Sequence, residues 1–145
     1  MKKQLKVLIP LLLCIIISVL FINFGKVNYD NIAMPRFSPP SYVFIIVWSI
    51  IYLIFYLTMI KNLSYNRIYI LYIIILTMHV LWNFLFFFMG YFLISLILMA
   101  ILYFTSFVYV YYFSQIKKRY FYIYLVYLIW LMIATYLNIG VYLLN

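Results

Sequence analysis

Residues 34–48, MPRFSPPSYVFIIVW, decide the fold, because a proline-rich connector here passes directly into an apolar run. The segment contains three prolines, one arginine and four aromatic side chains. Paired prolines favour extended backbone before them and do not fit inside a helix, so we expect a helix to begin near residue 41. A simple turn needs no such aromatic content, and we interpret residues 29–40 as a lid or binding loop.

The composition on both sides of this junction is that of a membrane protein. Hydrophobic residues make up 72% of the 145-residue chain and charged residues 8%, whereas about a quarter of a soluble protein is charged. The mean hydropathy is +1.22. Because about 20 apolar residues cross a bilayer as a helix, we expect one domain, residues 1–145, with spans at residues 5–24, 41–60, 68–88, 91–114 and 120–143. The predicted fold class is all-α, a polytopic five-helix membrane bundle with a loop lid between the first two helices.

The net charge of +9 is explained by membrane topology, through the distribution of the Lys and Arg residues, rather than by nucleic-acid binding. If the N-terminus is cytoplasmic, only Lys26 and Arg36 lie outside, and the other eight Lys and Arg residues lie on the inner side. The positive-inside rule therefore predicts an integral protein, of the cell membrane, whose first loop and C-terminus face outward. The expected surroundings are the lipid bilayer, with no nucleic-acid partner.

Few residues are available for acid–base or metal chemistry. Asp30 is the only acid and lies in the first loop, whereas proton-coupled pumps keep carboxylates within the membrane. Glycosidases need two carboxyl groups, so they are disfavoured as well. Cys14 and His79 are the only cysteine and histidine, too few for an ordinary zinc or iron site. No metal ligands are predicted, although a haem with one axial ligand stays open.

One face of the third span and one face of the fifth collect polar and aromatic residues at helical spacing. These residues are His79, Trp82, Asn83 and Phe86 in the third span, and Tyr127, Trp130, Ala134 and Asn138 in the fifth. His79 has three interpretations: hydrogen bonding between helices, contact with a ligand, or metal ligation. The first two also apply to Asn138.

Helix geometry places several of these residues at related depths. At about 1.5 Å per residue, Trp48 lies about 10 Å below the outer end of the second span. Trp82 and Asn138 come to similar depths, and Trp130 lies near the middle of the bilayer. We therefore hypothesise that the four wall a cavity that opens outward beneath residues 29–40.

Other residues of the fourth and fifth spans are given simpler roles. Aromatic belts at the membrane interfaces are expected to contain Tyr103, Tyr109, Tyr111, Tyr112, Tyr120, Tyr122 and Tyr124. Small side chains let helices approach closely, and a candidate dimer seam on the fourth span consists of Ser95, Ala100, Thr105 and Ser106.

The same segments resemble the TspO/MBR family, the tryptophan-rich sensory proteins related to translocator protein, or peripheral-type benzodiazepine receptor. The family pattern W-Y-x-x-L-x-K-P-x-F-x-P-P, followed by V-F-G-P-V-W-T-x-L-Y, is matched at Tyr29, Ile32, Pro35, Phe37, Pro39, Pro40, Val43, Phe44, Val47, Trp48, Ser49 and Tyr52. The third-span pattern N-x-x-W-x-P-L-F-F is matched at Trp82, Leu85, Phe86 and Phe87. The fifth-span pattern P-Y-x-x-W-x-x-F-A-x-x-L-N, closing in L-N, is matched at Tyr127, Trp130, Ala134, Leu137, Asn138, Leu144 and Asn145. Departures from these patterns are Asn28, Met34, Ile45, Ile46, His79, Phe84 and Val126.

The resemblance implies a pocket under the first loop, a homodimer, and a tetrapyrrole ligand such as protoporphyrin IX or haem, with no obligatory cofactor. We expect the ligand to contact Tyr29, Pro39, Pro40, Phe44, Trp48, His79, Trp82, Asn83, Phe86, Tyr127, Trp130, Ala134 and Asn138. Arg36 is expected to pair with a propionate at the mouth. The function expected is that of a membrane sensor or regulator.

Two alternatives stay open. One is light-dependent breakdown of porphyrin, in which Trp48 and Trp130 would be catalytic without conventional acid–base machinery. The other is transport of porphyrin or another apolar metabolite.

Overall fold

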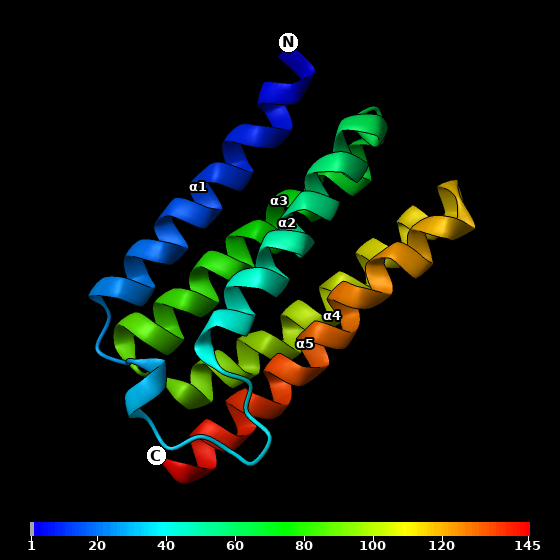
Figure 1. Ribbon diagram of the computed structural model, residues 1–145. Helices are drawn as coiled ribbons and strands as arrows, with labels where there is room; N and C mark the ends of the chain where they lie inside the picture. The colour runs from blue at the N-terminus through cyan, green and yellow to red at the C-terminus, as the bar shows by residue number, and fades with distance from the viewer. Residues whose placement is uncertain (1) are drawn as a thin grey trace.

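The computed structural model describes residues 2–145, with Lys2 described by its backbone alone. Within this part of the chain, five long helices run alternately up and down, and the two termini lie at opposite ends (Figure 1). The helices are α1 (Lys2–Phe24), α2 (Ser41–Asn62), α3 (Asn66–Asn83), α4 (Phe92–Ile116) and α5 (Lys118–Leu144). All five are long and apolar enough to cross a membrane. The predicted all-α bundle of five membrane-length helices is confirmed.

Two short elements complete the chain. The 3₁₀ turn η1 (Tyr29–Asn31) lies in the loop between α1 and α2, and the π-helical segment η2 (Phe84–Met89) continues α3. When η2 is counted with α3, the helix ends lie close to the expected spans, and the largest difference is at α1, expected from residue 5 and observed from Lys2. Residues 68–88 were expected to form one uniform helix, and nothing in their sequence predicted the widened π turn at the end.

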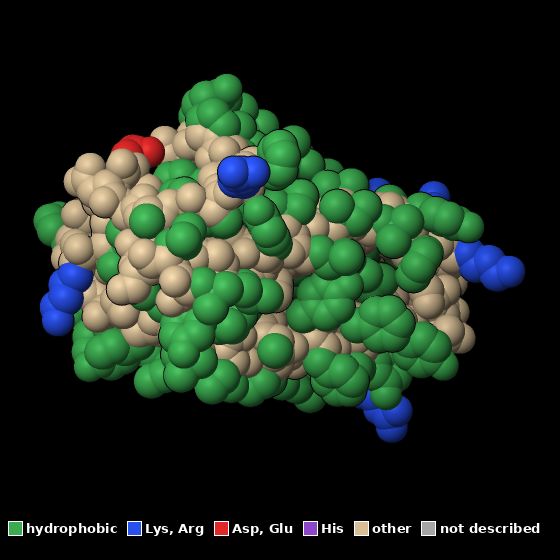
Figure 2. Space-filling model, turned by 90° about the horizontal axis from the view of Figure 1, so that it is seen from below, with side chains coloured by type: hydrophobic (Ala, Val, Ile, Leu, Met, Phe, Trp, Pro, Cys, Tyr) green, Lys and Arg blue, Asp and Glu red, His purple; other side chains and the backbone are tan. Residues whose placement is uncertain are grey.

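The helices close into a ring. α1 packs on α2, α2 on α5, α5 on α4, α4 on α3, and α3 back on α1. The outer surface of this ring is mostly apolar: in the view from below, hydrophobic side chains cover most of the surface and Lys and Arg side chains are few (Figure 2). Such a surface suits lipid, while the inner faces of the helices form the core.

Pro10 lies inside α1, where its ring crowds the carbonyl of Lys6 and supplies no N–H to it. Tyr69 of α3 donates to the Lys6 carbonyl at 3.3 Å, and Tyr72 donates to the Val7 carbonyl at 2.9 Å. In a bilayer, a neighbouring helix has to satisfy carbonyls that a proline leaves free. The two tyrosines therefore tie α1 to α3 at the position that the proline disturbs.

Three tyrosines that were assigned to the membrane interfaces lie in the core instead. Tyr109, Tyr120 and Tyr124 are buried. The Tyr124 hydroxyl lies 2.5 Å from Thr58 Oγ1 and 3.1 Å from the Tyr109 hydroxyl, and Asn62 donates to the Tyr120 hydroxyl at 3.0 Å. The assignment was wrong for these three because the four-residue step from Tyr120 to Tyr124 places both on the inner face of α5, whatever their distance from the helix end.

The dimer seam predicted on α4 is also wrong for two of its four residues. Ser95 and Ser106 are buried within the ring, where they lie 3.2 Å from Asn138 Oδ1 and 2.8 Å from the Tyr127 hydroxyl. Their small size serves the close packing of α4 on α5 within one chain.

Replacing Tyr72 by phenylalanine tests the tie between α1 and α3. The change removes the hydrogen bond to the Val7 carbonyl, and we expect the free energy of unfolding to fall by about 1 kcal/mol. The measurement is thermal unfolding in detergent, with Tyr111→Phe as the control, because Tyr111 is exposed. An unchanged melting temperature for Tyr72→Phe would contradict the role given to this bond.

Candidate functional site

The loop of residues 25–40, which we call the lid, closes the end of the ring that carries the C-terminus (Figure 1). Its first residues are held by backbone hydrogen bonds, from Val27 N–H to the Phe87 carbonyl at 3.0 Å and from Lys26 N–H to the Phe88 carbonyl at 3.5 Å. Gly25 comes so close to η2 that a Cβ there would lie 2.4 Å from the Phe87 carbonyl oxygen. The lid is therefore hinged on the π-helical segment.

The middle of the lid is held by the end of α5. Ala33 N–H donates to Asn145 Oδ1 at 3.1 Å, and Asn145 Nδ2 donates back to the Ala33 carbonyl at 2.9 Å. Tyr136 donates to the Arg36 carbonyl at 2.6 Å. The Asn145 side chain thus accepts one hydrogen bond from the Ala33 backbone and donates another to it, a pair that we call the two-way clasp. The Tyr136 hydroxyl adds a third bond to the lid.

Gly140 lets the lid lie against α5. A Cβ at this position would lie 2.4 Å from Pro35 Cγ and 2.5 Å from Pro35 Cβ. Such distances do not occur between real side chains, so the absence of a side chain at position 140 sets how closely the lid can approach.

A small cavity of about 30 Å³ lies beneath the lid. Its lining comes from the lid, α2, α3, η2 and α5, and consists of Tyr29, Met34, Phe44, Trp82, Phe86, Phe87, Ala134, Leu137, Asn138 and Val141. Six of these ten were predicted as ligand contacts, whereas Met34, Phe87, Leu137 and Val141 were not. In its present shape, the cavity has room for only one or two water molecules.

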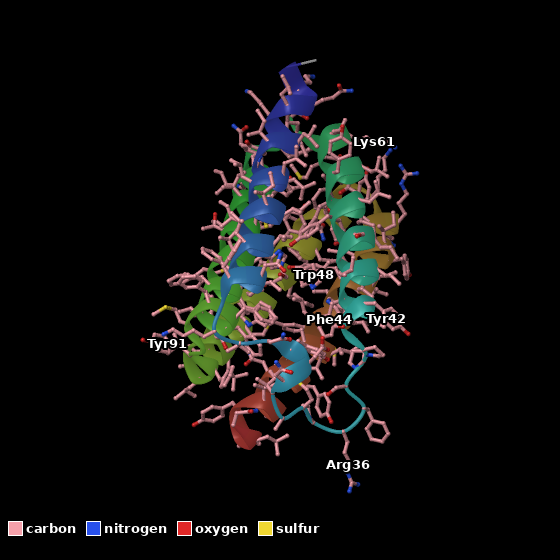
Figure 3. The ribbon with its side chains drawn as sticks, turned by 60° about the vertical axis from the view of Figure 1, so that its left-hand side comes forward. Arg36, Tyr42, Phe44, Trp48, Lys61 and Tyr91 are labelled. Carbon is pink, nitrogen blue, oxygen red and sulfur yellow. The ribbon has the colours of Figure 1, made fainter. Side chains whose placement is uncertain are left out.

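Aromatic rings connect this cavity with the interior of the ring. Tyr29 meets Phe44 edge-on with centroids 4.9 Å apart, and Phe44 meets Trp130 at 5.2 Å. Trp48 meets His79 at 4.8 Å. Phe44 and Trp48 extend from α2 toward the bundle interior, as Figure 3 shows. The structure therefore brings residues from the lid, α2, α3 and α5 into one continuous aromatic region.

Unpaired polar atoms gather in this region. Within residues 2–145, four buried side-chain nitrogen atoms have no hydrogen-bond partner: His79 Nδ1, Trp82 Nε1, Trp130 Nε1 and Asn138 Nδ2. A buried donor without an acceptor costs about 1–3 kcal/mol, so such groups call for an explanation. All four belong to residues that the sequence analysis selected as ligand contacts.

The remaining predicted contacts have structural partners or lie at the margin. Asn83 donates to Ser18 Oγ at 3.2 Å and to the His79 carbonyl at 2.8 Å. The Pro39 carbonyl accepts from the Tyr29 hydroxyl at 2.8 Å, and Pro40 immediately precedes α2. Arg36 is exposed at the tip of the lid and points away from the bundle (Figure 3). Their roles as ligand contacts stay predictions.

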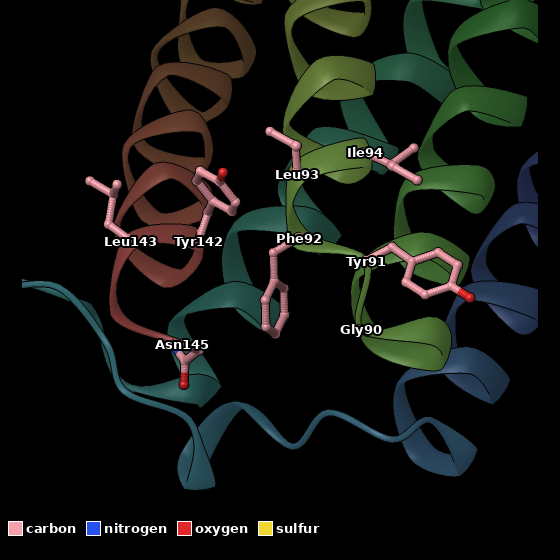
Figure 4. Close-up of a pocket in the computed structure, with 8 residues that line it drawn as sticks. All are labelled: Gly90, Tyr91, Phe92, Leu93, Ile94, Tyr142, Leu143 and Asn145. Atoms are coloured by element: carbon pink, nitrogen blue, oxygen red, sulfur yellow. The ribbon is translucent and has the colours of Figure 1, made fainter.

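A second hollow lies outside the ring, at the lid ends of α4 and α5 (Figure 4). It is open, has a volume of about 680 Å³, and is lined by Gly90, Tyr91, Phe92, Leu93, Ile94, Tyr142, Leu143 and Asn145. Its lining is mainly apolar and faces outward, as the lipid-facing side of a helix pair does. None of the four residues that carry the unpaired nitrogen atoms is among its lining residues.

The ring of helices, the lid and the aromatic region beneath it define a small helical membrane protein with an enclosed site at one end. The TspO/MBR family model matches residues 6–144 of the chain. The chain therefore belongs to the TspO/MBR family and is an integral membrane protein, and the resemblance drawn from its motifs is confirmed. No curated protein gives a significant sequence match. Membership supports a general role as a membrane sensor or transporter related to tetrapyrroles.

Gly140→Ala tests how the lid is seated. The added methyl group would overlap Pro35, so we expect the lid to move off α5 and its backbone amides to exchange faster. Hydrogen–deuterium exchange at the amides of Ala33, Met34 and Arg36 measures the change. Ile139→Ala is the control, because Ile139 is exposed on the same helix. Unchanged lid exchange in Gly140→Ala would contradict the contact.

Proposed function

We propose that the protein is a membrane receptor or sensor for a planar tetrapyrrole, protoporphyrin IX or haem, bound beneath the lid. The observation that carries the proposal is the set of four unpartnered nitrogen atoms among residues chosen as ligand contacts. Indole N–H groups can only donate, so Trp82 and Trp130 require acceptors. Protoporphyrin IX and haem have propionate carboxylates as acceptors, and a wide apolar face for aromatic side chains.

The ligand needs more space than the closed site offers. Pockets for drug-sized molecules have volumes of about 300–1,000 Å³, whereas the cavity beneath the lid measures about 30 Å³. Binding therefore requires the lid to swing outward and the rings of Tyr29 and Phe44 to separate. The lid is held at its middle by three hydrogen bonds between its backbone and the side chains of Asn145 and Tyr136, each worth about 0.5–1.5 kcal/mol, so opening is energetically accessible.

We place the lid on the outer face of the cell membrane, with the N-terminus in the cytoplasm. The lid end carries Lys26 and Arg36, and the opposite end carries the remaining basic residues at the helix termini, among them Lys61 (Figure 3). The positive-inside rule supports this orientation. A homodimer, which family resemblance suggests, completes the proposal.

Trp48→Phe and Trp130→Phe test the site. Each change keeps an aromatic ring but reduces its area and removes an indole N–H, which at Trp130 is one of the unpartnered donors, so we expect protoporphyrin IX to bind roughly tenfold more weakly. Fluorescence titration in the dark on detergent-solubilised protein measures the affinity. Phe104→Leu, an exposed position on α4, is the control. Equal affinities for all three variants and the unmodified protein would reject this site.

Asn145→Ala tests whether the lid controls access. Loss of the two-way clasp should speed association and dissociation of protoporphyrin IX together, by roughly threefold to tenfold for about 1 kcal/mol of lid stability. Stopped-flow fluorescence measures both rates. Asn31→Ala makes the same chemical change at an exposed lid position. Unchanged rates in Asn145→Ala would exclude opening of this clasp as a step in binding.

A second candidate function is light-dependent oxidative breakdown of porphyrin, with dioxygen as oxidant. One arrangement favours it: Trp48 stacks on Tyr52 with centroids 5.5 Å apart, and the Tyr52 hydroxyl lies 3.8 Å from Cys14 Sγ. The oxidisable side chains of Trp48, Tyr52 and Cys14 thus form a continuous series of neighbours that begins at the site. Product formation that requires light and is lost in Trp48→Phe would favour this function, whereas binding without conversion favours the receptor.

The third candidate function is transport of porphyrin. Porphyrin flux into vesicles containing the purified protein tests it.

A further inference from the structure

We propose that His79 contacts the ligand as a hydrogen-bond donor through Nδ1, and that Ser106 and Tyr127 hold its imidazole in the tautomer this requires. The inference rests on the proposed function, because it concerns the ligand of the same site. It narrows the chemistry of the ligand. The ligand is a planar molecule that accepts a hydrogen bond from His79 through a nitrogen or oxygen atom, and His79 does not ligate a metal centre.

The geometry fixes one nitrogen of the ring and leaves the other free. His79 is only 3% exposed. Its Nε2 lies 3.1 Å from the Tyr127 hydroxyl, which lies 2.8 Å from Ser106 Oγ. Its Nδ1 is buried and has no partner within residues 2–145. The imidazole and the Trp48 indole form a T-shaped pair with ring centroids 4.8 Å apart, and Trp48 is one of the three indoles proposed to contact the ligand.

The positions of the protons follow from counting donors and acceptors along this chain of three groups. Ser106 Oγ has no hydrogen-bond partner except Tyr127 in the described residues. If Ser106 donates to Tyr127 and Tyr127 donates to Nε2, both hydroxyl protons are used and only the Nδ1 N–H is unpaired. If Nε2 carries the proton instead, it donates to Tyr127, and Nδ1 is left as an unpaired acceptor. In addition, the hydroxyl proton of either Ser106 or Tyr127 then has no acceptor. Because each buried unpaired group is costly, the first arrangement is favoured.

The imidazole is neutral in this arrangement. Asp30 is the only acidic residue of the chain and lies in the lid, so no carboxylate is available to pair with an imidazolium inside the ring. An unpaired buried charge is far more costly than a neutral ring. His79 therefore presents an N–H at Nδ1, with no lone pair there for iron, while its Nε2 lone pair is occupied by Tyr127.

The first test reads the tautomer directly. His79 is the only histidine, so protein labelled with ¹⁵N-histidine gives one pair of ring signals in NMR. We expect Nδ1 in the protonated range and Nε2 in the unprotonated range. In Tyr127→Phe the donor to Nε2 is gone, and the signals should shift toward a mixture of tautomers; Ser106→Ala should shift them in the same direction. A protonated Nε2 in the unmodified protein would overturn the proposal.

The second test reads the contact with the ligand. We expect His79→Ala to bind protoporphyrin IX about tenfold more weakly, the effect of one hydrogen bond to a buried donor. His79→Asn keeps an N–H donor and should recover most of the affinity. Ferric haem added to the unmodified protein should show the same absorption and electron paramagnetic resonance spectra as haem added to His79→Ala.

The outcomes separate this inference from the proposed function. If Trp48→Phe and Trp130→Phe weaken binding but His79→Ala does not, the site stands and the role of His79 is wrong. A histidine-ligated haem spectrum that disappears in His79→Ala also overturns the inference while leaving the site in place. If none of the three variants changes affinity, both proposals fail.

Discussion

The structure depends on one constraint: inside a bilayer, polar groups must find partners within the protein, since lipid supplies none. The consequences are visible throughout the ring. The carbonyls near Pro10 receive tyrosine hydroxyls from α3, Asn62 at the end of α2 bonds Tyr120, and Thr58 bonds Tyr124. A chain with so few charged residues thus uses phenols and hydroxyls to fix which helix faces which.

Against this background the two ends of the ring differ. At the end opposite the lid, the hydroxyls of Tyr109, Tyr120 and Tyr124 are matched with partners. Toward the lid, four buried nitrogen atoms are not. Matched groups stabilise the fold, whereas unmatched donors reduce its stability unless something else supplies acceptors. We infer that the end opposite the lid contributes more to the free energy of folding. The lid end is less well satisfied in the absence of a ligand, as expected of a binding site.

The sequence predicted much of this arrangement, and its failures have a common cause. Long apolar runs predicted five helices, and the motifs around Trp48, Trp82 and Trp130 identified one end of the bundle as the site. Helix rotation could not be predicted, because helices that are apolar on all sides carry little amphipathic signal. For that reason Tyr109 and Tyr124 were placed at the interface and Val141 was missed. Of the four residues that the depth estimate placed around one cavity, Trp82 and Asn138 line it, whereas Trp48 and Trp130 do not. Depth depends only on position along a helix, but facing a cavity also depends on rotation.

The π-helical segment η2 has a consequence for how the lid can vary. The lid is hinged on carbonyl oxygens of Phe87 and Phe88, which any residue would provide equally. The segment FLFFFM can therefore change its side chains with little effect on the hinge, provided that the wide turn persists. The strict requirement falls on the opposite partner, Gly25, where even one methyl group would collide with the Phe87 carbonyl. Mutational tolerance at the lid should accordingly be uneven: the hinge itself asks little of the η2 side chains, of which Phe86 and Phe87 line the cavity, whereas Gly25 and Gly140 leave almost no room for substitution.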